Sequence, residues 1–299
     1  MSTVIIFGAT GSVASVIART AHEKGCNVVL AMRDTQKEVP GLVAGSESSF
    51  RRVHADLKNA ESIRAAVEES GAKRAFMYFI HGTGNHMRSS IEAMKAGGIE
   101  LVVFLSTCSV LGDARDVPAS DYVPFWHAQV EICLDEVFGP AGYVTLRPSR
   151  FSTAFAEYRK DIKAGHVKLY APEFAMDYIS PADIGRVGGS ILADGMRNGE
   201  NRVFLFGPNQ VTLREGVEFI AKTLGQTVEI SKKTDEEVVD GYVKMGIPKD
   251  KAEYFLGRAA IRPADDLYNQ NVGNVLSYSG VPATTLQDWV LENKANFER

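Results

Sequence analysis

The sequence lacks the features that mark secreted, membrane-spanning and nucleic-acid-binding proteins. Its three cysteines, Cys26, Cys108 and Cys133, are widely spaced and odd in number, which argues against a disulfide framework or a zinc site. No stretch approaches the roughly 20 apolar residues of a membrane-spanning helix, and the apolar residues 4–7 are followed at once by glycine and polar residues, unlike a secretory signal. The chain has 33 basic and 37 acidic residues, so no positive excess attracts phosphate backbones. We therefore expect a soluble, cytoplasmic protein that binds neither nucleic acid nor membrane.

The first half of the chain alternates short runs of β-branched and apolar residues with longer amphipathic segments. This is the pattern of βαβ units that build a parallel sheet with helices on both faces. Glycines follow several of the amphipathic segments, as expected where helices end. The predicted strands are residues 3–7, 27–32, 49–54, 74–80, 101–106 and 143–147, and the predicted helices are residues 12–24, 60–70, 87–95 and 125–138. The fold class is therefore α/β, a doubly wound parallel sheet of the Rossmann type.

The second half of the chain loses this regular alternation after Arg147. A helix is expected at residues 183–192, a strand at 202–206 that returns to the sheet, and a short strand at 228–231 among two or three helices that follow Thr212. We expect a dinucleotide-binding domain over residues 1–150, joined by residues 183–207. Residues 151–182 and 208–299 then form a smaller, mostly helical, substrate-facing lobe.

A glycine-rich turn, Gly8-Ala9-Thr10-Gly11-Ser12-Val13-Ala14, follows the first strand and opens the first helix. Glycines at such a turn let backbone amides approach a pyrophosphate, and the helix N-terminus adds positive potential. Ala14 stands in place of the third glycine, where only close helix packing is required. The position between a strand and a helix favours a dinucleotide site over an ordinary turn. The expected contacts with the cofactor are Gly8, Thr10, Gly11, Ser12 and Val13.

The second strand ends in Met32-Arg33, where a site that prefers NAD usually has an acidic residue. A guanidinium pairs well with a phosphate, and Lys37 follows one helical turn later, so the pattern favours the 2′-phosphate of NADP(H). Asp34 keeps open the alternative that Arg33 is a solvated loop residue. Asp56 and Leu57 follow the third strand and either contact the adenine or, in the case of Asp56, cap a helix.

Together these residues resemble the NmrA-like family of atypical short-chain dehydrogenases. The likeness rests on the GATGSVA turn, Arg33, Asp56-Leu57, and the stretch from Glu131 to Arg147-Pro148. It continues through Asp177-Tyr178-Ile179, Asp183-Ile184-Gly185, and Gly207-Pro208 leading to Thr212. The resemblance implies an NADP(H)-binding protein. The family contains both reductases and proteins that bind the dinucleotide as a signal.

The catalytic residues of ordinary short-chain dehydrogenases are only partly present. Those enzymes use a Tyr-x-x-x-Lys pair and a serine, but four residues after Tyr122 the chain has Trp126. The remaining candidates are Ser106 or Thr107 to orient a carbonyl, and Tyr122 or His127 to supply a proton. His127 lies four residues before Glu131, a spacing that resembles the family helix in which a basic residue faces the cofactor ribose. The alternative is that His127 is a structural residue.

Further residues are expected to lie beside the nicotinamide and to form the substrate pocket. His81 and His86 follow the fourth strand, in a loop expected to pass beside the nicotinamide. Phe79, near the end of that strand, and His81 are further expected contacts with the cofactor. The spacing of His81 and His86 does not suit a metal site. An apolar pocket for a hydrophobic or aromatic substrate is expected, although each of its residues has a core role as the alternative. Its predicted members are Cys108, Trp126, Phe151, Phe155, Tyr158 and Tyr178.

The sequence therefore favours an NADP(H)-dependent oxidoreductase that reduces a carbonyl or activated double bond of a hydrophobic small molecule. One alternative is an NADP(H)-sensing regulator that acts on a protein partner without catalysis. Another is an isomerase or cyclase on the same fold.

Overall fold

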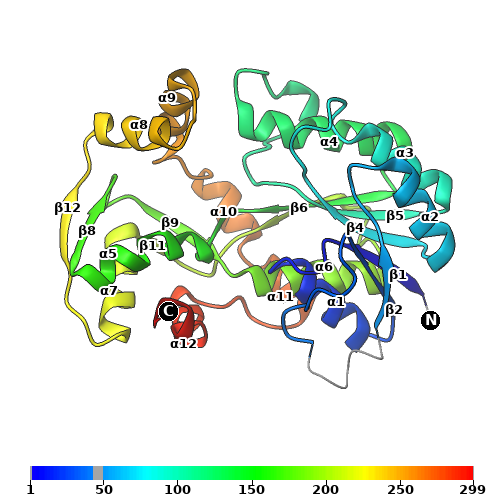
Figure 1. The fold of residues 1–299 in the computed structure, drawn as a ribbon, viewed down its shortest axis with the longest axis horizontal. Coiled ribbons are helices and arrows are strands. Elements are labelled where there is room, and N and C mark those ends of the chain that lie inside the picture. Colours follow the sequence, from blue (N-terminus) through cyan, green and yellow to red (C-terminus); the bar gives the residue numbers. More distant parts are fainter. Residues whose placement is uncertain (1, 43–49, 299) are drawn as a thin grey trace. The chain divides into compact units, whose positions relative to one another are not determined.

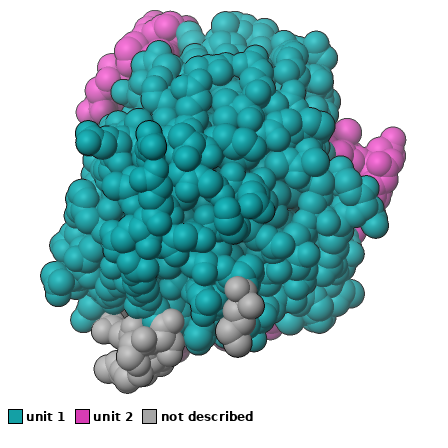
Figure 2. Space-filling view, turned by 90° about the vertical axis from the view of Figure 1, so that its right-hand side faces the viewer, with its two compact units in different colours: residues 1–149, 181–205, 273–282 teal, residues 150–180, 206–272, 283–299 magenta. Residues whose placement is uncertain are grey.

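The computed structural model describes residues 2–42 and 50–298, so Ser49, predicted as the first residue of a strand, lies outside the described residues. The chain divides into two compact units (Figure 1). Unit 1 comprises Met1–Ser149, Pro181–Leu205 and Gly273–Pro282, and unit 2 comprises Arg150–Ser180, Phe206–Val272 and Ala283–Arg299. Figure 2 shows one face of the molecule with the two units in different colours.

Unit 1 is built on a parallel sheet with the strand order β10-β6-β5-β4-β1-β2-β3. Its strands are β1 Thr3–Phe7, β2 Asn27–Met32, β3 Phe50–His54, β4 Arg74–Tyr78, β5 Leu101–Leu105, β6 Tyr143–Pro148 and β10 Arg202–Leu205. Apolar residues fill most of these strands, and the central strands are buried almost completely, as expected for a sheet covered on both faces. The predicted doubly wound Rossmann fold is confirmed.

Helices cover both faces of this sheet (Figure 1). Its helices are α1 Ala14–Glu23, α2 Ala60–Ser70, α3 Arg88–Gly97, α4 Tyr122–Phe138, α6 Pro181–Asp194 and α11 Asn274–Ser279, with a short 3-10 turn, η2, at Ala114–Asp116. Helices α2, α3 and α4 pack in sequence on one face, and α1, α6 and α11 pack together on the other. The strand order reverses between β1 and β4, and sheets of this kind bind ligands beyond such a point.

Unit 2 has a core of its own, formed by apolar side chains such as Phe155, Leu213 and Trp289. Its strands are β7 Arg150–Phe151, β8 His166–Leu169, β9 Ala175–Ile179, β11 Gln210–Thr212 and β12 Glu229–Lys232. They form one sheet with the order β11-β9-β7 and a second that pairs β12 with β8. Its helices are η3 Ser152–Tyr158, α5 Arg159–Ala164, α7 Leu213–Thr223, α8 Asp235–Lys244, α9 Lys249–Arg258, α10 Asp265–Asn271, α12 Leu286–Glu292 and α13 Lys294–Glu298.

Three expectations about the chain's organisation are wrong. Helix α4 begins at Tyr122 rather than Phe125, because a proline such as Pro124 is tolerated within the first turn of a helix. The described chain after Thr212 contains α7 to α13, more than the two or three helices expected. Residues 273–282, assigned to the substrate-facing lobe, belong to unit 1, where Asn274 donates a hydrogen bond to the Phe204 carbonyl.

Close packing between α1 and α6 fixes the helix that follows the glycine turn. A Cβ on Gly185 of α6 would lie 2.4 Å from the Cβ of Val16, and one on Gly189 would lie 2.6 Å from the Cβ of Thr20. Such distances are shorter than van der Waals contact allows, so glycine is required at both positions for the helices to approach this closely. The packing therefore fixes the distance between α6 and α1, the helix that follows the glycine turn.

Replacing Gly185 with alanine is expected to lower the free energy of unfolding by about 1–3 kcal/mol, the usual cost of overpacking a close-packed interior. The added methyl group would meet Val16 and the backbone oxygen of Val13, 3.0 Å away. Urea unfolding of the variant beside Gly199→Ala provides the measurement. A Cβ on Gly199 would meet nothing within 4 Å, but this residue has a positive φ of 73°, so the control reports backbone strain without a clash. A Gly185→Ala variant as stable as the parent would contradict the packing argument.

Candidate functional site

A pocket of about 690 Å³ opens at the carboxyl ends of β1, β2, β3 and β4, all within unit 1. Its lining contains eight of the eleven residues predicted to contact the cofactor. These eight are Gly8, Thr10, Arg33, Lys37, Asp56, Leu57, Phe79 and His81. The sequence did not indicate several further lining residues, which are Phe7, Ala9, Ala31, Met32, Asp34, Ala55, Lys58, Tyr78 and Ile80.

The glycine turn forms one wall of this pocket. Gly8 has a φ of +69°, a conformation that favours glycine, and its carbonyl accepts a hydrogen bond of 2.9 Å from the Gly11 amide. Gly11, Ser12 and Val13 complete the turn without appearing in the pocket lining. Helix α1 begins without a side-chain cap. The amides of Ser15 and Val16 donate to the carbonyls of Gly11 and Val13, so an anion there would meet the N–H groups of the turn that precedes them.

Positive charge lines the opposite wall. Arg33 and Lys37 are both exposed and both line the pocket. The carboxylate of Asp34 accepts a hydrogen bond of 3.0 Å from the Gln36 amide, which closes a tight turn in its own loop. Arg52 of β3 donates hydrogen bonds of 2.7 and 2.9 Å to the carbonyls of Thr35 and Lys37. The loop that carries Arg33 and Lys37 is therefore fixed to the sheet.

Asp56 shapes the turn after β3 and does not cap α2. Its carboxylate accepts a hydrogen bond of 3.0 Å from the Lys58 amide. The cap of α2 is Asn59, whose side chain accepts a hydrogen bond from the Ser62 amide. The capping alternative for Asp56 is therefore wrong, and Asp56 lines the pocket beside Leu57.

An aromatic cluster continues from Phe79 and His81 onto the start of α4. Phe79 lies 6.3 Å from Trp126 in a stacked arrangement and 5.1 Å from His127. The His81 ring meets the face of Trp126 edge-on at 4.8 Å. Tyr122 stacks on Trp126 at 6.2 Å, one helical turn away. The structure thus brings together predicted residues from the loop after β4 and from α4.

The orientation of His127 decides what its imidazole can do. Its Nδ1 lies 3.0 Å from the Val123 carbonyl oxygen, and because a carbonyl only accepts, Nδ1 carries the proton. Burial lowers the pKa of His127 from its usual range, so the neutral ring is favoured and its Nε2 is an acceptor. The Nδ1 proton is engaged in the hydrogen bond to the Val123 carbonyl and the neutral ring carries none at Nε2, so this geometry disfavours the predicted role of His127 as proton donor. The ring remains suited to accept a hydrogen bond from a hydroxyl group.

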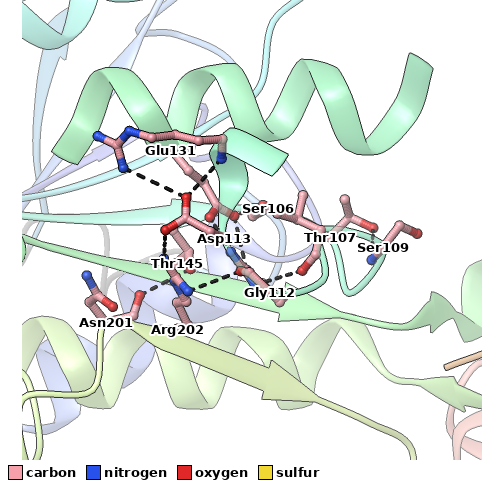
Figure 3. Close-up of polar contacts among 12 residues, drawn as sticks. Ser106, Thr107, Ser109, Gly112, Asp113, Glu131, Thr145, Asn201 and Arg202 are labelled. Carbon is pink, nitrogen blue, oxygen red and sulfur yellow. Dashed lines mark hydrogen bonds and ion pairs between the residues drawn. The ribbon is translucent and has the colours of Figure 1, made fainter. Parts of the chain in front are cut away.

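Ser106 is also ruled out as a group that orients a carbonyl. It is buried, and its hydroxyl donates a hydrogen bond of 2.6 Å to Oε1 of Glu131 (Figure 3). Glu131 also receives hydrogen bonds from Arg147, at 2.5 Å from Nη2 and 3.2 Å from Nε. Both charged side chains are almost fully buried. Ser106 therefore belongs to a structural ion-pair network. The prediction that it orients a carbonyl is wrong, because its hydroxyl already donates its hydrogen bond to Glu131.

Thr107 is the remaining hydroxyl candidate after β5. It is half-buried, and its Oγ1 accepts a hydrogen bond of 3.3 Å from the Ser109 amide (Figure 3). The loop is held in place by bonds from the Cys108 amide to the Pro148 carbonyl, 2.9 Å, and from Arg202 to the Gly112 carbonyl, 3.1 Å. The hydroxyl of Thr107 is thus presented by a fixed loop. Cys108 is buried beside it.

The aromatic residues predicted to bind substrate differ in their environments. Phe155, Tyr158 and Tyr178 belong to the core of unit 2, and the rings of Phe155 and Tyr178 lie 4.7 Å apart. A Cβ on Gly216 would lie 2.3 Å from the Phe155 ring, so these residues have the packing role that was the alternative. Phe151 and Trp126 are half-buried.

A pH dependence follows from the burial of His127. Because its folded-state pKa is lowered, the unfolded chain binds a proton near pH 6.5 that the folded chain does not, so stability falls as pH drops below that value. His127→Asn, which keeps a donor near Val123, is expected to remove up to about 1.4 kcal/mol of this loss per pH unit. Urea unfolding at pH 7.5 and 5.5 measures it. Identical pH slopes for parent and variant would contradict the assignment.

The sequence profile of the NmrA-like family matches residues 1–262. The chain belongs to the NmrA-like family. This NmrA-like protein is 32% identical to the nitrogen metabolite regulation-like protein bik4 of Gibberella fujikuroi over 97% of its own length and 95% of that protein. It is 24% identical to the prestalk A differentiation protein A of Dictyostelium discoideum, covering 84% of this chain and 79% of that one.

Solved structures share the fold of this NmrA-like protein at low sequence identity. The NADPH-dependent quinone oxidoreductase QOR2 of Escherichia coli, crystallised with NADPH, superimposes with a TM-score of 0.72 at 16% identity, covering 97% of this chain and 99% of that one. The Citrobacter triphenylmethane reductase, crystallised with NADP(H), gives a TM-score of 0.68 at 16% identity with the same coverage. The described residues contain no helix with the length and hydropathy of a membrane span.

Proposed function

We propose that this protein is an NADP(H)-dependent oxidoreductase that reduces a carbonyl or activated double bond of a hydrophobic small molecule. The observation that carries the proposal is the continuity of one pocket. The glycine turn and the cations Arg33 and Lys37 line it, and Phe79 and His81 connect it to the aromatic cluster of α4.

The residues present fit NADP(H). The glycine turn, in which Gly8 has a positive φ, and the start of α1, which has no side-chain cap, suit a pyrophosphate. Arg33 and Lys37 suit the 2′-phosphate, because the loop that holds them is fixed by Arg52 and offers two cations to one dianion. The dinucleotide, when bound, supplies the hydride. Quinone and dye reductases among the proteins of similar fold support a hydrophobic acceptor.

The protein's own residues have separate tasks in this proposal. His127 accepts a hydrogen bond at Nε2 from a ribose hydroxyl, since its Nδ1 is bound to Val123. Thr107 donates a hydrogen bond to the substrate oxygen and keeps its proton, because its Oγ1 already accepts from the Ser109 amide. Tyr122, stacked on Trp126, is the proton donor on α4. The aromatic rings exclude water and favour a flat substrate.

The test is whether the protein oxidises NADPH in the presence of quinones, enones or aromatic ketones. The loss of the near-ultraviolet absorbance of NADPH measures the reaction. We expect turnover with at least one class, and a loss of most of it in Tyr122→Phe, while Tyr143→Phe, a buried phenol of β6, retains it. No oxidation across the panel would contradict the proposed reaction. Unchanged turnover in Tyr122→Phe would remove its role as donor.

The second candidate function is an NADP(H)-sensing regulator. Trp126 at the position of the usual lysine favours it, as does the name of the relative from Gibberella fujikuroi, a regulation-like protein. Affinity capture with the protein held in NADP⁺ or NADPH distinguishes the two. A sensor requires a partner whose retention changes with the redox state of the dinucleotide.

A further inference from the structure

Tyr78, the last residue of β4, lies against the glycine turn. The register of the parallel pair β1 and β4 places Ile6 opposite Phe76, so Gly8 comes level with Tyr78 two residues later. A Cβ on Gly8 would lie 2.4 Å from the Tyr78 Cε1 and 3.0 Å from its hydroxyl oxygen. The phenol ring therefore covers the backbone of Gly8, and a larger residue there has no room.

The hydroxyl of Tyr78 is available to a ligand. Tyr78 is half-buried and lines the 690 Å³ pocket. Within residues 2–42 and 50–298, its hydroxyl makes no hydrogen bond. Burial raises the pKa of Tyr78 above its usual value of 10.0, so the phenol is a neutral donor at physiological pH. A half-buried donor without a partner favours binding of an acceptor there.

The charges around Tyr78 indicate which part of a dinucleotide it meets. Arg33 and Asp56, at the ends of β2 and β3, are the two charged groups that influence its ionisation. In sheets of this kind, the first strand end and its glycine turn meet the pyrophosphate, and the second strand end meets the adenosine ribose. Tyr78 lies against the glycine turn and within the electrostatic reach of Arg33. It therefore faces the adenosine half.

We propose that Tyr78 is a positioning residue for the adenosine diphosphate half of the dinucleotide and donates a hydrogen bond from its hydroxyl to a phosphate oxygen there. This inference rests on the proposed function, because it requires that the pocket binds NADP(H). A neutral phenol suits this place, since it adds a hydrogen bond to an anionic oxygen without bringing a further charge beside Arg33 and Asp56.

Calorimetric titration of NADP⁺ and of the fragment 2′,5′-ADP into the parent and Tyr78→Phe tests the inference. The variant keeps the ring that packs on Gly8 and loses only the hydroxyl. We expect both dissociation constants to rise by roughly tenfold, the effect of one charge-assisted hydrogen bond. Tyr143→Phe is the matched control, a buried phenol of the same sheet outside the pocket lining, and is expected to leave both constants unchanged.

The outcomes separate this inference from the proposed function. If the parent binds NADP⁺ and Tyr78→Phe binds both ligands equally well, the role of Tyr78 is wrong while the cofactor site stands. If Tyr78→Phe weakens the binding of NADP⁺ but not that of 2′,5′-ADP, the hydroxyl contacts the nicotinamide half, and the inference is wrong. If the parent binds neither ligand, the proposed function fails and the inference fails with it. Melting temperatures of both variants near the parent's show that the affinities compare folded proteins.

Discussion

Replacing Arg33 with alanine is expected to raise the dissociation constant for NADP⁺ by about 10- to 100-fold and to leave that for NAD⁺ nearly unchanged. The factor corresponds to the loss of charge-assisted hydrogen bonds to a phosphate, about 1.5–3 kcal/mol. Arg33 lines the pocket on a loop held by Arg52, so the backbone of this loop does not have to be ordered at each binding event. Competitive titrations at fixed ionic strength measure both constants, since exposed charges are screened by salt.

Arg51→Ala is the matched control for this prediction. Arg51 lies on β3, is exposed, and pairs with Glu69 at 2.6 Å outside the pocket, so its removal takes away the same net charge without touching the loop of Arg33. If Arg51→Ala weakens NADP⁺ binding as much as Arg33→Ala, the effect is long-range and no specific 2′-phosphate contact exists. If Arg33→Ala weakens the binding of NAD⁺ and of NADP⁺ equally, Arg33 does not determine the preference for the 2′-phosphate.

Glu131→Ala is expected to have the largest effect on stability, a loss of about 3–5 kcal/mol in the free energy of unfolding. Arg147 is fully buried. Among the residues that the structure describes, its guanidinium would keep the Val110 carbonyl at 2.7 Å and the Phe204 ring at 5.3 Å. Ser106 would lose its acceptor as well. A cation buried without its counterion is costly, whereas the intact pair contributes little beyond an apolar pair. Urea unfolding measures the difference.

The double variant Glu131→Leu with Arg147→Met isolates the cause of that loss. Because it removes both charges and keeps much of the volume, it is expected to be more stable than Glu131→Ala. If the free energy of unfolding of Glu131→Ala falls by less than about 1 kcal/mol, water enters the cavity and solvates Arg147. The ion pair then does not stabilise the packing of β6 against α4. A double variant less stable than the single one would assign the network a larger role than the pair alone.

The sequence predicted most of the sheet because its strands are apolar runs with few alternatives. The predicted bounds of β1 and β2 agree with the structure, and the other strands of the parallel sheet differ from their predicted bounds only at the ends. The predicted helix end at Gly71 is also found, with a left-handed φ of 65°. Residues 273–282 were misplaced because their contacts, such as Arg197 donating to the Ser277 carbonyl at 2.6 Å, join segments far apart in the chain.

The site was predicted where backbone motifs define it and missed where packing does. Gly8, Arg33 and Asp56 follow strand ends, so topology alone brings them to one pocket. Ser106 also follows a strand end, but its side chain turns into the core toward Glu131, which lies 25 residues later in sequence. Tyr78 was not identified because it lies within the predicted apolar strand 74–80, where an aromatic residue is usually part of the core. Neither orientation leaves a pattern in the sequence.

The most direct test of the account is calorimetric titration of the unmodified protein with NADPH and, separately, with NADH. The account predicts one binding site per chain and an affinity for NADPH at least about tenfold higher, because Arg33 and Lys37 meet a phosphate that NADH lacks. Equal affinities would contradict the role of these cations. Absence of binding by either dinucleotide would contradict the assignment of the pocket itself.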